Sequence, residues 1–313
     1  MPGFLRSISC MLALAMGNGC GKPPPEPLQL ATNVWPGYEP LYLARHLGAL
    51  DPRSFRLVEM ASSSDCMRAL KAGRVAAAAL TLDEVFTLLQ EGVDLQIVLI
   101  MDVSNGADAL LGRPDMKTLA ALKGHRVGVE QTAVGAYLLS RALDQAGLRP
   151  EDIVVVPMTE GAHEARFLDG SVDAVVTFEP SRTRLMNSGA KVLFDSSRIP
   201  NEIVDVLVFR GEVARARPEA MAMVRNGWFK AQAHLHQRPQ EACRQMALRE
   251  GLDSEAFRKA LEGLSFPDED ADRRMRAGEL LPPARRLADL MHRQRLLAHP
   301  VDPARLLSRH VNP

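Results

Sequence analysis

The sequence predicts an α/β protein of two similar lobes, each a small, mainly parallel sheet flanked by helices, joined by two crossing strands. Three observations lead to this fold. Short apolar runs alternate with amphipathic stretches that end on glycine, which is typical of parallel strands joined by helices. The same order of elements returns later in the chain. A chain of 313 residues is also long enough for two lobes of ordinary size.

The first elements follow from local signals. A strand is expected to end near Val34, and a helix follows the segment WPGYEP. Pro40 suits the first turn of that helix, because a residue there needs no backbone N–H donor, and Gly48 suits its end. The next strand is expected over residues 55–60.

A second group of signals continues the alternation. Ser64 can cap the helix that follows, and Gly73 can end it. A strand over residues 75–80 then leads to Thr81 and Glu84, whose spacing is that of a capping box at the start of another helix. Strand and helix therefore alternate through the first part of the chain.

An internal repeat predicts that the two lobes are alike. Gly73 and Gly92 lie 19 positions apart, and so do Gly170 and Gly189. After KAGRVAAAAL in the first case, and within LDGSVDAVVTF in the second, a strand leads through a helix to the second glycine. This matched order indicates two copies of one supersecondary unit.

Two breaks in the pattern place the crossings between the lobes. The segment DVSNGADALLG, residues 102–112, interrupts an apolar run with small polar residues, and SSRIPNE precedes the later strand IVDVLVF. We therefore expect residues 28–103 and 205–313 to form the first lobe and residues 104–204 the second. The proline-broken helices after about Glu212 are expected to pack back on the first lobe.

The N-terminal segment predicts export. Residues 1–20 carry Arg6, an apolar run over residues 8–16 that is too short to cross a bilayer, and small residues before Cys20, as a signal peptide does. This pattern predicts lipidation of Cys20, with ordinary secretion and cleavage nearby as the alternative. The proline-rich residues 21–27 are expected to form an extended tether.

Charge, cysteine content and motifs exclude several classes of function. Lys plus Arg equals Asp plus Glu at 38 each, so we expect no nucleic-acid binding. Cys66 and Cys243 are either buried thiols or a disulfide pair, and both interpretations stay open. His234 and His236 point to different faces of a helix, so no metal site is expected. Since GxSxG, HExxH and a glycine-rich turn after a strand are all missing, we expect neither an enzyme nor a cofactor.

Candidate ligand contacts follow from topology, because ligands of open α/β sheets bind beyond the carboxyl ends of the strands. Loops at these ends carry hydroxyl, amide, carboxylate and aromatic groups. The residues that we expect to contact a ligand are Trp35, Tyr38, Ser64, Thr81, Asp83, Ser104, Asn105, Gly106, Thr132, Glu160, Phe178 and Glu179. Each group has a structural alternative, such as helix capping for Thr81 and Asp83, a hinge for the crossing residues, and loop packing for the aromatic pair.

These loops carry a family resemblance. NVWPGYEPLYLARHLGAL, SSSDCMRALKAG, VSNGADALL, HRVGVEQTAVGAYLL and GSVDAVVTFEPSRTRL together resemble ABC solute-binding proteins of the nitrate, taurine and sulfonate type, within the thiamine-pyrimidine-synthase-like superfamily. The resemblance implies a type II periplasmic-binding-protein fold that closes over a small solute. It also implies a monomer in the periplasm, anchored by lipid to the inner membrane, that delivers the solute to an ABC permease and its ATPase.

The charge of the candidate loops bears on the ligand. They hold Asp65, Asp83, Glu84, Glu160 and Glu179, which would repel an anion. We therefore expect a neutral or amine-bearing, nitrogen-containing organic solute. A sulfonate or nitrate binder of the same family, a ligand-sensing lipoprotein without transport, and a pyrimidine-synthase-like enzyme stay open as alternatives, although the cysteine-rich motif of that synthase has no counterpart here.

Overall fold

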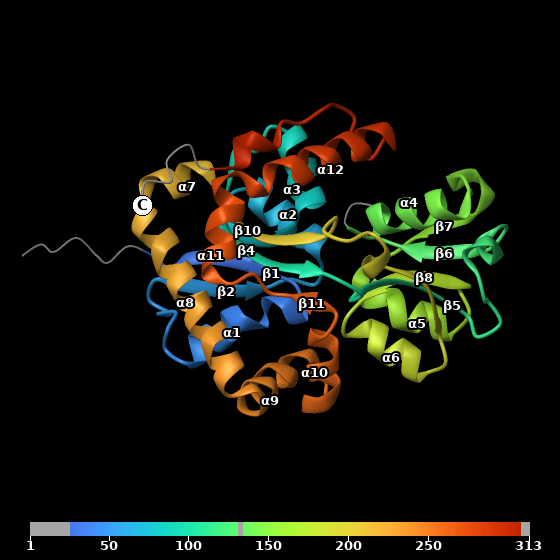
Figure 1. The fold of residues 1–313 in the computed structure, drawn as a ribbon, viewed down its shortest axis with the longest axis horizontal. Helices are drawn as coiled ribbons and strands as arrows, with labels where there is room; N and C mark the ends of the chain where they lie inside the picture. The colour runs from blue at the N-terminus through green and yellow to red at the C-terminus, as the bar shows by residue number, and fades with distance from the viewer. Residues whose placement is uncertain (1–25, 131–133, 308–313) are drawn as a thin grey trace, which may run out of the picture.

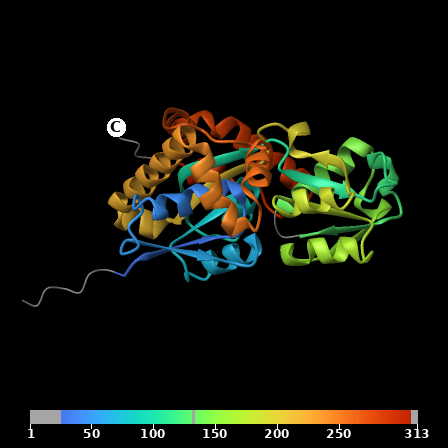
Figure 2. The same cartoon turned by 90° about the horizontal axis from the view of Figure 1, so that it is seen from below.

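The computed structural model describes residues 26–130 and 134–307, and these fold into two α/β lobes (Figure 1). The first lobe has a six-stranded sheet in the order β11-β4-β10-β3-β1-β2, and the second a five-stranded sheet in the order β7-β6-β8-β5-β9. Seen from below, the lobes lie side by side (Figure 2). The two-lobed α/β prediction is confirmed.

The first lobe combines the beginning and the end of the chain. Its strands are β1 (Leu28–Thr32), β2 (Phe55–Glu59), β3 (Ala77–Thr81), β4 (Leu95–Ser104), β10 (Val204–Arg210) and β11 (Leu264–Ser265). Its helices are α1 (Glu39–His46), α2 (Ser63–Lys71), α3 (Leu82–Gln90), α7 (Gly211–Ala216), α8 (Pro218–Gln237), α9 (Pro239–Glu250), α10 (Ser254–Leu261), α11 (Glu269–Arg274) and α12 (Leu281–Arg293).

The second lobe is formed by the middle of the chain. Its strands are β5 (Asp108–Gly112), β6 (Arg126–Val129), β7 (Val154–Pro157), β8 (Ala174–Phe178) and β9 (Lys191–Asp195). Its helices are α4 (Val134–Ala146), α5 (His163–Leu168) and α6 (Ser181–Asn187). The chain passes between the lobes after β4 and again before β10.

Both sheets are mixed, but most strands of each run in one direction, as predicted. Strands β1, β2 and β3 pair in parallel, and so do β6, β7 and β8. The strands next to the crossings, β4 and β10 in one lobe and β5 and β9 in the other, pair antiparallel with their neighbours. The reason is that the chain leaves the first sheet along β4 and returns to it along β10. The returning strand therefore runs in the opposite direction.

Helices cover both faces of the first sheet because its central strands are apolar on both sides. In β3, Ala78 and Leu80 face α2, α3 and α12, whereas Ala77 and Ala79 face α1, α8, α9 and α10. Such uninterrupted burial is typical of a strand covered on both faces. The C-terminal helices thus pack on the first lobe, α8 and α9 against α1, and α12 against α3.

The predicted internal repeat is confirmed in three dimensions. Helix α2, strand β3 and helix α3 in the first lobe match α5, β8 and α6 in the second. Gly73, Gly92, Gly170 and Gly189 all have positive φ, from 68° to 99°, and each follows a helix. A residue without a side chain is favoured there, because other L residues rarely adopt this conformation.

One capping expectation is wrong and another is confirmed. Ser62, not Ser64, is the N-cap of α2, and its side chain accepts a hydrogen bond from the Asp65 backbone N–H at 3.2 Å. Thr81 and Glu84 do form the capping box of α3, with the Thr81 N–H donating to Glu84 Oε2 at 3.0 Å. Because three serines stand in a row before α2, the sequence does not show which of them is its N-cap. The Thr-x-x-Glu spacing, in contrast, identifies the N-cap of α3.

No helix among residues 26–130 and 134–307 is long and apolar enough to cross a membrane. Cys66 and Cys243 are both free and buried in the structure. Cys66 lies in the core on the α2 side of the first sheet, and Cys243 lies in the core on the α9 side. The sheet therefore separates the two thiols, which excludes the disulfide interpretation.

Candidate functional site

A small cavity lies between the two lobes. Its walls come from the carboxyl ends of β1, β3 and β8, from the crossing strands, and from the starts of the nearby helices. The lining residues are Asn33, Trp35, Tyr38, Ser63, Thr81, Glu84 and Asp205 of the first lobe and Asp108, Val134 and Phe178 of the second. The free space measures about 20 Å³, about enough for one water molecule. The lobes are therefore closed around the site.

Aromatic side chains close the cavity from both sides. The rings of Trp35 and Phe178 meet edge to face across the gap, with centroids 5.8 Å apart and planes at 81°. Tyr38 lies beside them in the short 3-10 helix Pro36–Tyr38, where Pro36 fixes the backbone at the end of β1. This is the position in which the sequence predicted an aromatic wall.

The aromatic residues are held in place by acids on the crossing strands. Trp35 Nε1 donates to Asp102 Oδ2 at 3.3 Å, and the Tyr38 hydroxyl donates to Asp205 Oδ1 at 2.5 Å. Asp102 on β4 and Asp205 on β10 lie directly opposite each other in the strand register. The orientation of the Trp35 and Tyr38 rings therefore depends on the buried carboxyl groups of Asp102 and Asp205.

The cavity is strongly acidic. Of the described residues that line it, Glu84, Asp108 and Asp205 are carboxylic acids and none is Lys, Arg or His. Asp108 Oδ2 and Asp205 Oδ2 have no hydrogen-bond donor among the described residues, and neither has Asp102 Oδ1. An acid in this position is expensive to ionise unless a positive group arrives.

The pKa values reflect this lack of cations. Burial raises the pKa of Asp108 to about 7, and the charges of Asp83 and Glu179 add to that effect. Burial, together with the neighbouring Asp102, raises the pKa of Asp205 well above its usual range. Burial also raises the pKa of Glu84, and Asp83 beside it adds to the rise. Clusters of perturbed acids in a cleft are typical of functional sites.

Further polar contacts join the two lobes around the cavity. Asn33 Nδ2 of the first lobe donates to Glu160 Oε2 of the second at 3.3 Å. The Ser64 hydroxyl of α2 donates to Glu130 Oε1, which follows β6. The predicted residues Ser64 and Glu160 thus lie at the rim, where they link the closed lobes.

Glu179 and its neighbours lie behind the second-lobe wall. Glu179 is buried and forms an ion pair with Arg182 at 3.0 Å, and its Oε2 accepts a hydrogen bond from the Thr183 backbone N–H at 3.1 Å. His163 Nδ1 lies 3.2 Å from Thr177 Oγ1. Burial lowers the pKa of His163 to about 4, so this ring is neutral near pH 7. Glu179 is therefore neutralised, and it does not line the cavity.

The predicted crossing residues form a polar joint. Ser104 Oγ lies 2.8 Å from Ser196 Oγ, which also accepts a hydrogen bond from the Gly106 N–H at 2.6 Å. The Asn105 N–H donates to the Gly263 carbonyl at 2.7 Å, and its side chain is exposed. These groups join the lobes instead of lining the cavity.

The predicted contacts thus separate into three groups. Trp35, Tyr38, Thr81 and Phe178 line the cavity. Asp83 is buried behind it at the start of α3. The other predicted contacts described above also lie outside the cavity lining, and they are Ser64, Ser104, Asn105, Gly106, Glu160 and Glu179. Thr132 and the lipidation candidate Cys20 lie outside the described residues.

The acids of the crossing strands were not among the predicted contacts. Asp102, Asp108 and Asp205 stand inside apolar strand segments, in IVLIMDV, ADALL and IVDVLVF. An ionisable residue in such a segment is almost never fully buried without a purpose. This signal was available in the sequence, and the loop-based search did not use it. Asn33 and Ser63 gave no comparable signal.

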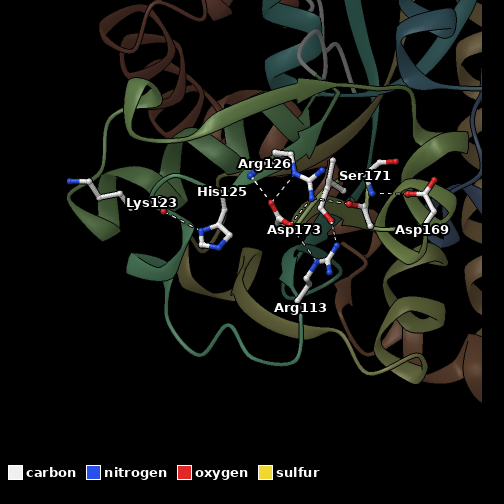
Figure 3. Close-up of polar contacts among 9 residues, drawn as sticks. Arg113, Lys123, His125, Arg126, Asp169, Ser171 and Asp173 are labelled. Atoms are coloured by element: carbon white, nitrogen blue, oxygen red, sulfur yellow. Dashed lines mark hydrogen bonds and ion pairs between the residues drawn. The ribbon is translucent and has the colours of Figure 1, made fainter.

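Charged side chains at the other end of the second sheet are paired with one another, unlike the acids of the cavity (Figure 3). Arg126 begins β6 and pairs with Asp173, just before β8, at 2.9 Å, and Arg113 after β5 lies 3.5 Å from the same carboxylate. Hydrogen bonding from Arg126 lowers the pKa of Asp173 to about 2. This network is satisfied within the protein, in contrast to the cleft acids. A group of His, Cys, Asp or Glu suited to a metal ion is missing from the described ranges.

Comparisons with known proteins agree with this architecture. A match to the NMT1-like family covers residues 21–249. A protein of Escherichia coli strain K12, named as an aliphatic sulfonates-binding protein, is 35% identical over 109 residues. That alignment covers 34% of this chain, and the chain thus spans about a third of the length of this curated relative.

Two solved structures share the fold. The periplasmic aliphatic sulphonate binding protein of Escherichia coli superposes with a TM-score of 0.74 at 23% identity, over 90% of this chain and 97% of that one. The alkanesulfonate-binding protein of Xanthomonas axonopodis pv. citri, bound to MOPS, gives a TM-score of 0.75 at 21% identity, over 90% and 96% of the two chains.

Fold and cavity together define a two-lobed protein of the periplasmic-binding-protein fold class, with a cavity between the lobes. The chain belongs to the NMT1-like family. The predicted resemblance to ABC solute-binding proteins of the nitrate, taurine and sulfonate type is thereby confirmed.

Proposed function

We propose that this protein is the solute-binding component of an ABC importer, which captures a small, polar, nitrogen-containing organic solute in the cleft and delivers it to a membrane permease. The observation that carries the proposal is the cavity itself, because both lobes line it and close around it. A solute held there contacts both lobes at once. Family membership supports the same function.

The mechanism follows from the size of the cavity. About 20 Å³ of free space cannot admit an organic molecule, so the lobes must open before a solute enters. A solute that touches both lobes binds the closed state better than the open state. Only that difference in affinity can shift the population toward closure. A permease that recognises the closed form would then receive loaded protein.

The site supports binding more than catalysis. Of the described residues that line the cavity, none is His, Lys or Cys, so a hydroxyl or thiol activated by a histidine or lysine base is not assembled there. Cys66 lies in α2, and burial raises its pKa, which keeps the thiol unreactive. His163 is neutral and buried behind Phe178. We therefore propose a binding protein and not an enzyme.

We also propose that the protein works as a monomer in the periplasm, tethered to the inner membrane by lipid on Cys20. Support for this location comes from the leader, residues 1–20, and from the proline-rich segment 21–27 that follows it. A tether leaves the two lobes free to meet the permease. Metabolic labelling with a radioactive fatty acid, compared between wild type and Cys20→Ala, tests the anchor.

A sulfonate is the second candidate solute. The relative from Escherichia coli, 35% identical over 109 residues, is named for binding aliphatic sulfonates. Against it stand the acids of the cavity and the missing cation in its described lining. The charge of the bound solute therefore distinguishes the nitrogen-containing candidate from the sulfonate.

Native mass spectrometry tests the importer proposal. Protein isolated under native conditions from a bacterial periplasm is expected to retain one small compound per chain, or to bind one from a library of bacterial metabolites. Binding should raise its melting temperature, because a ligand of the folded state alone stabilises it by mass action. Absence of any retained compound and of any stabilising library member would contradict the proposal.

A further inference from the structure

We propose that the solute is a small organic cation with N–H donors, such as a protonated amine or a guanidinium, and that Asp108 of the second lobe and Asp205 of the first hold its charge between them. This inference rests on the proposed function and specifies the chemical class of the ligand. It concerns acids that line the cavity from both sides.

The first support is a set of buried oxygens without donors. Asp108 and Asp205 are 4% and 2% exposed and both line the cavity. Within the described part of the chain, Asp108 Oδ2 and Asp205 Oδ2 receive no hydrogen bond. Buried polar atoms in native proteins nearly always have a partner, so a missing partner is expected to come from outside.

The neighbouring acid Asp102 strengthens this argument. It lies opposite Asp205 in the register of β4 and β10, is fully buried, and also has an oxygen, Oδ1, without a donor among the described residues. A proton shared between the Asp102 and Asp205 side chains can join these two facing acids when no ligand is bound. A ligand with several N–H groups satisfies more of these oxygens than a single proton can.

The charges around the cavity do not cancel these acids. Glu84 adds a third lining carboxyl, and Asp83 lies behind it on α3. On the second lobe, Arg182 is paired with Glu179 at 3.0 Å, and its charge offsets only part of the rise in the pKa of Asp108. His163 is neutral near pH 7, because burial lowers its pKa to about 4. The described surroundings therefore favour a positive guest.

At the N-termini of α2 and α3, the usual kind of site for holding an anion, a side chain already caps a backbone N–H. The Thr81 N–H at the start of α3 donates to Glu84 Oε2 at 3.0 Å. The Asp65 N–H in the first turn of α2 donates to Ser62 Oγ at 3.2 Å. A sulfonate would have to displace these side-chain caps while lying against carboxyl groups. Repulsion between the sulfonate and ionised carboxyl groups in contact with it would exceed the stabilisation that a helix dipole supplies.

The aromatic walls suit a cation as well. Trp35 and Phe178 present their rings across the gap, and Tyr38 lies beside them. The negative face of an aromatic ring attracts a positive charge, most strongly where water is excluded. A quaternary ammonium would use the rings but could not donate to the orphan oxygens. The combination of rings and acceptors thus selects an N–H cation.

Matched sets of compounds that differ in charge test the inference. Guanidinium, urea and nitrate share a planar shape, and benzylammonium, benzyl alcohol and phenylmethanesulfonate share a ring. Each is added at millimolar concentration to the full-length protein, and the melting temperature and calorimetric affinity are measured. We expect the cation of each set to bind most tightly, by at least tenfold over its neutral partner, and the anion not to bind.

Variants then assign the charge to the proposed acids. Asp108→Asn and Asp205→Asn keep the size of the side chain and should each weaken the bound cation at least tenfold. Asp115→Asn, the same change at an exposed position outside the cavity, is the matched control and should leave affinity unchanged. Melting curves of each variant verify folding, and Asp108→Asn and Asp205→Asn test the inference independently of each other.

The outcomes distinguish this inference from the proposed function. If the neutral or anionic member of a set binds best, or if cation affinity survives both Asp→Asn changes, the cation assignment is overturned while the importer proposal stands. If the cations bind best and both variants weaken them, the assignment holds. If no member of either set and no metabolite in the library binds, the proposed function fails and this inference falls with it.

Discussion

Asp102, Asp108 and Asp205 are the residues on which this site depends. Each stands in a strand among apolar neighbours, and each keeps an oxygen without a donor among the described residues. Proteins retain such unfavourable groups where function requires them, at the expense of stability. The same chain pairs Asp173 with two arginines at the far end of its second sheet, so its acids are not left unpaired everywhere.

A stability measurement can reveal this cost. Asp102→Asn removes a buried charge while its amide oxygen can still accept the Trp35 Nε1 hydrogen bond. We expect the free energy of unfolding of the unliganded protein to rise by about 0.5–2 kcal/mol at pH 8. Thermal or urea denaturation measures the change. A less stable variant would show that the acid is a structural element of the fold.

The Trp35 ring should contribute directly to affinity. Trp35→Ala removes the edge-to-face contact with Phe178 and one wall of the cavity, so we expect about 1–2 kcal/mol of lost binding energy, roughly tenfold in affinity. Trp35→Phe keeps an aromatic ring and should restore part of it. Titration calorimetry of both variants checks the order. Equal affinity of Trp35→Ala and wild type would remove this ring from the site.

At the scale of elements, strand ends and helix starts bring these residues together. Trp35 and Tyr38 follow the end of β1, and Phe178 is the last residue of β8. Thr81 ends β3 and belongs to the capping box of α3. The sequence predicted this arrangement, because helix caps and glycine stops mark where strands must end. It could not predict which strands would run antiparallel, since that depends on how the chain crosses between sheets.

The crossing itself yields a prediction. Gly106 has φ of +115° and no atom within 4 Å of the place that a Cβ would occupy, whereas Gly161 is equally open but has an ordinary backbone conformation. Gly106→Ala should therefore cost about 1–2 kcal/mol of stability through backbone strain alone, and Gly161→Ala close to none. Thermal denaturation compares them. Equal melting temperatures would mean that the crossing relaxes freely.

At the scale of the whole molecule, the sequence predicted the fold better than the site. Repeats, caps and glycine spacing are local signals, and they predicted two lobes and a cleft between them. Contacts such as Trp35 with Phe178, or Asn33 with Glu160, join residues more than 120 positions apart. Their side-chain geometry depends on how two sheets approach, which no local pattern encodes. The unpaired acids were visible as charges in apolar strands, but their proximity was not.

The acids also give the molecule a pH dependence. Burial raises the pKa of Asp108 to about 7, of Glu160 to about 8 and of Glu250 to about 9. In the unfolded chain these groups ionise near pH 4, so between these values the folded state binds more protons. Stability of the unliganded protein should therefore fall as the pH rises from about 4 to 9.

Over the lower part of that range the buried His163 acts in the opposite sense. Its pKa is lowered to about 4 in the folded state, so its contribution is lost as the pH falls from about 6.5 to 4. Because three acids outweigh this one ring, we expect the melting temperature to be highest near pH 4. Affinity for a cationic solute should instead increase toward pH 8, because Asp108, whose pKa is about 7, is then ionised. Melting curves across pH, with and without the cation, check both slopes, and parallel slopes would contradict this prediction.

The central claim is that the lobes open to admit a solute and close when it binds. Small-angle X-ray scattering at pH 8, above the pKa of about 7 of Asp108, tests this claim most directly. We predict that the radius of gyration falls as the solute identified by mass spectrometry is titrated in, and that Asp205→Asn shifts this fall to at least tenfold higher concentration. An identical radius with and without bound solute would contradict the claim.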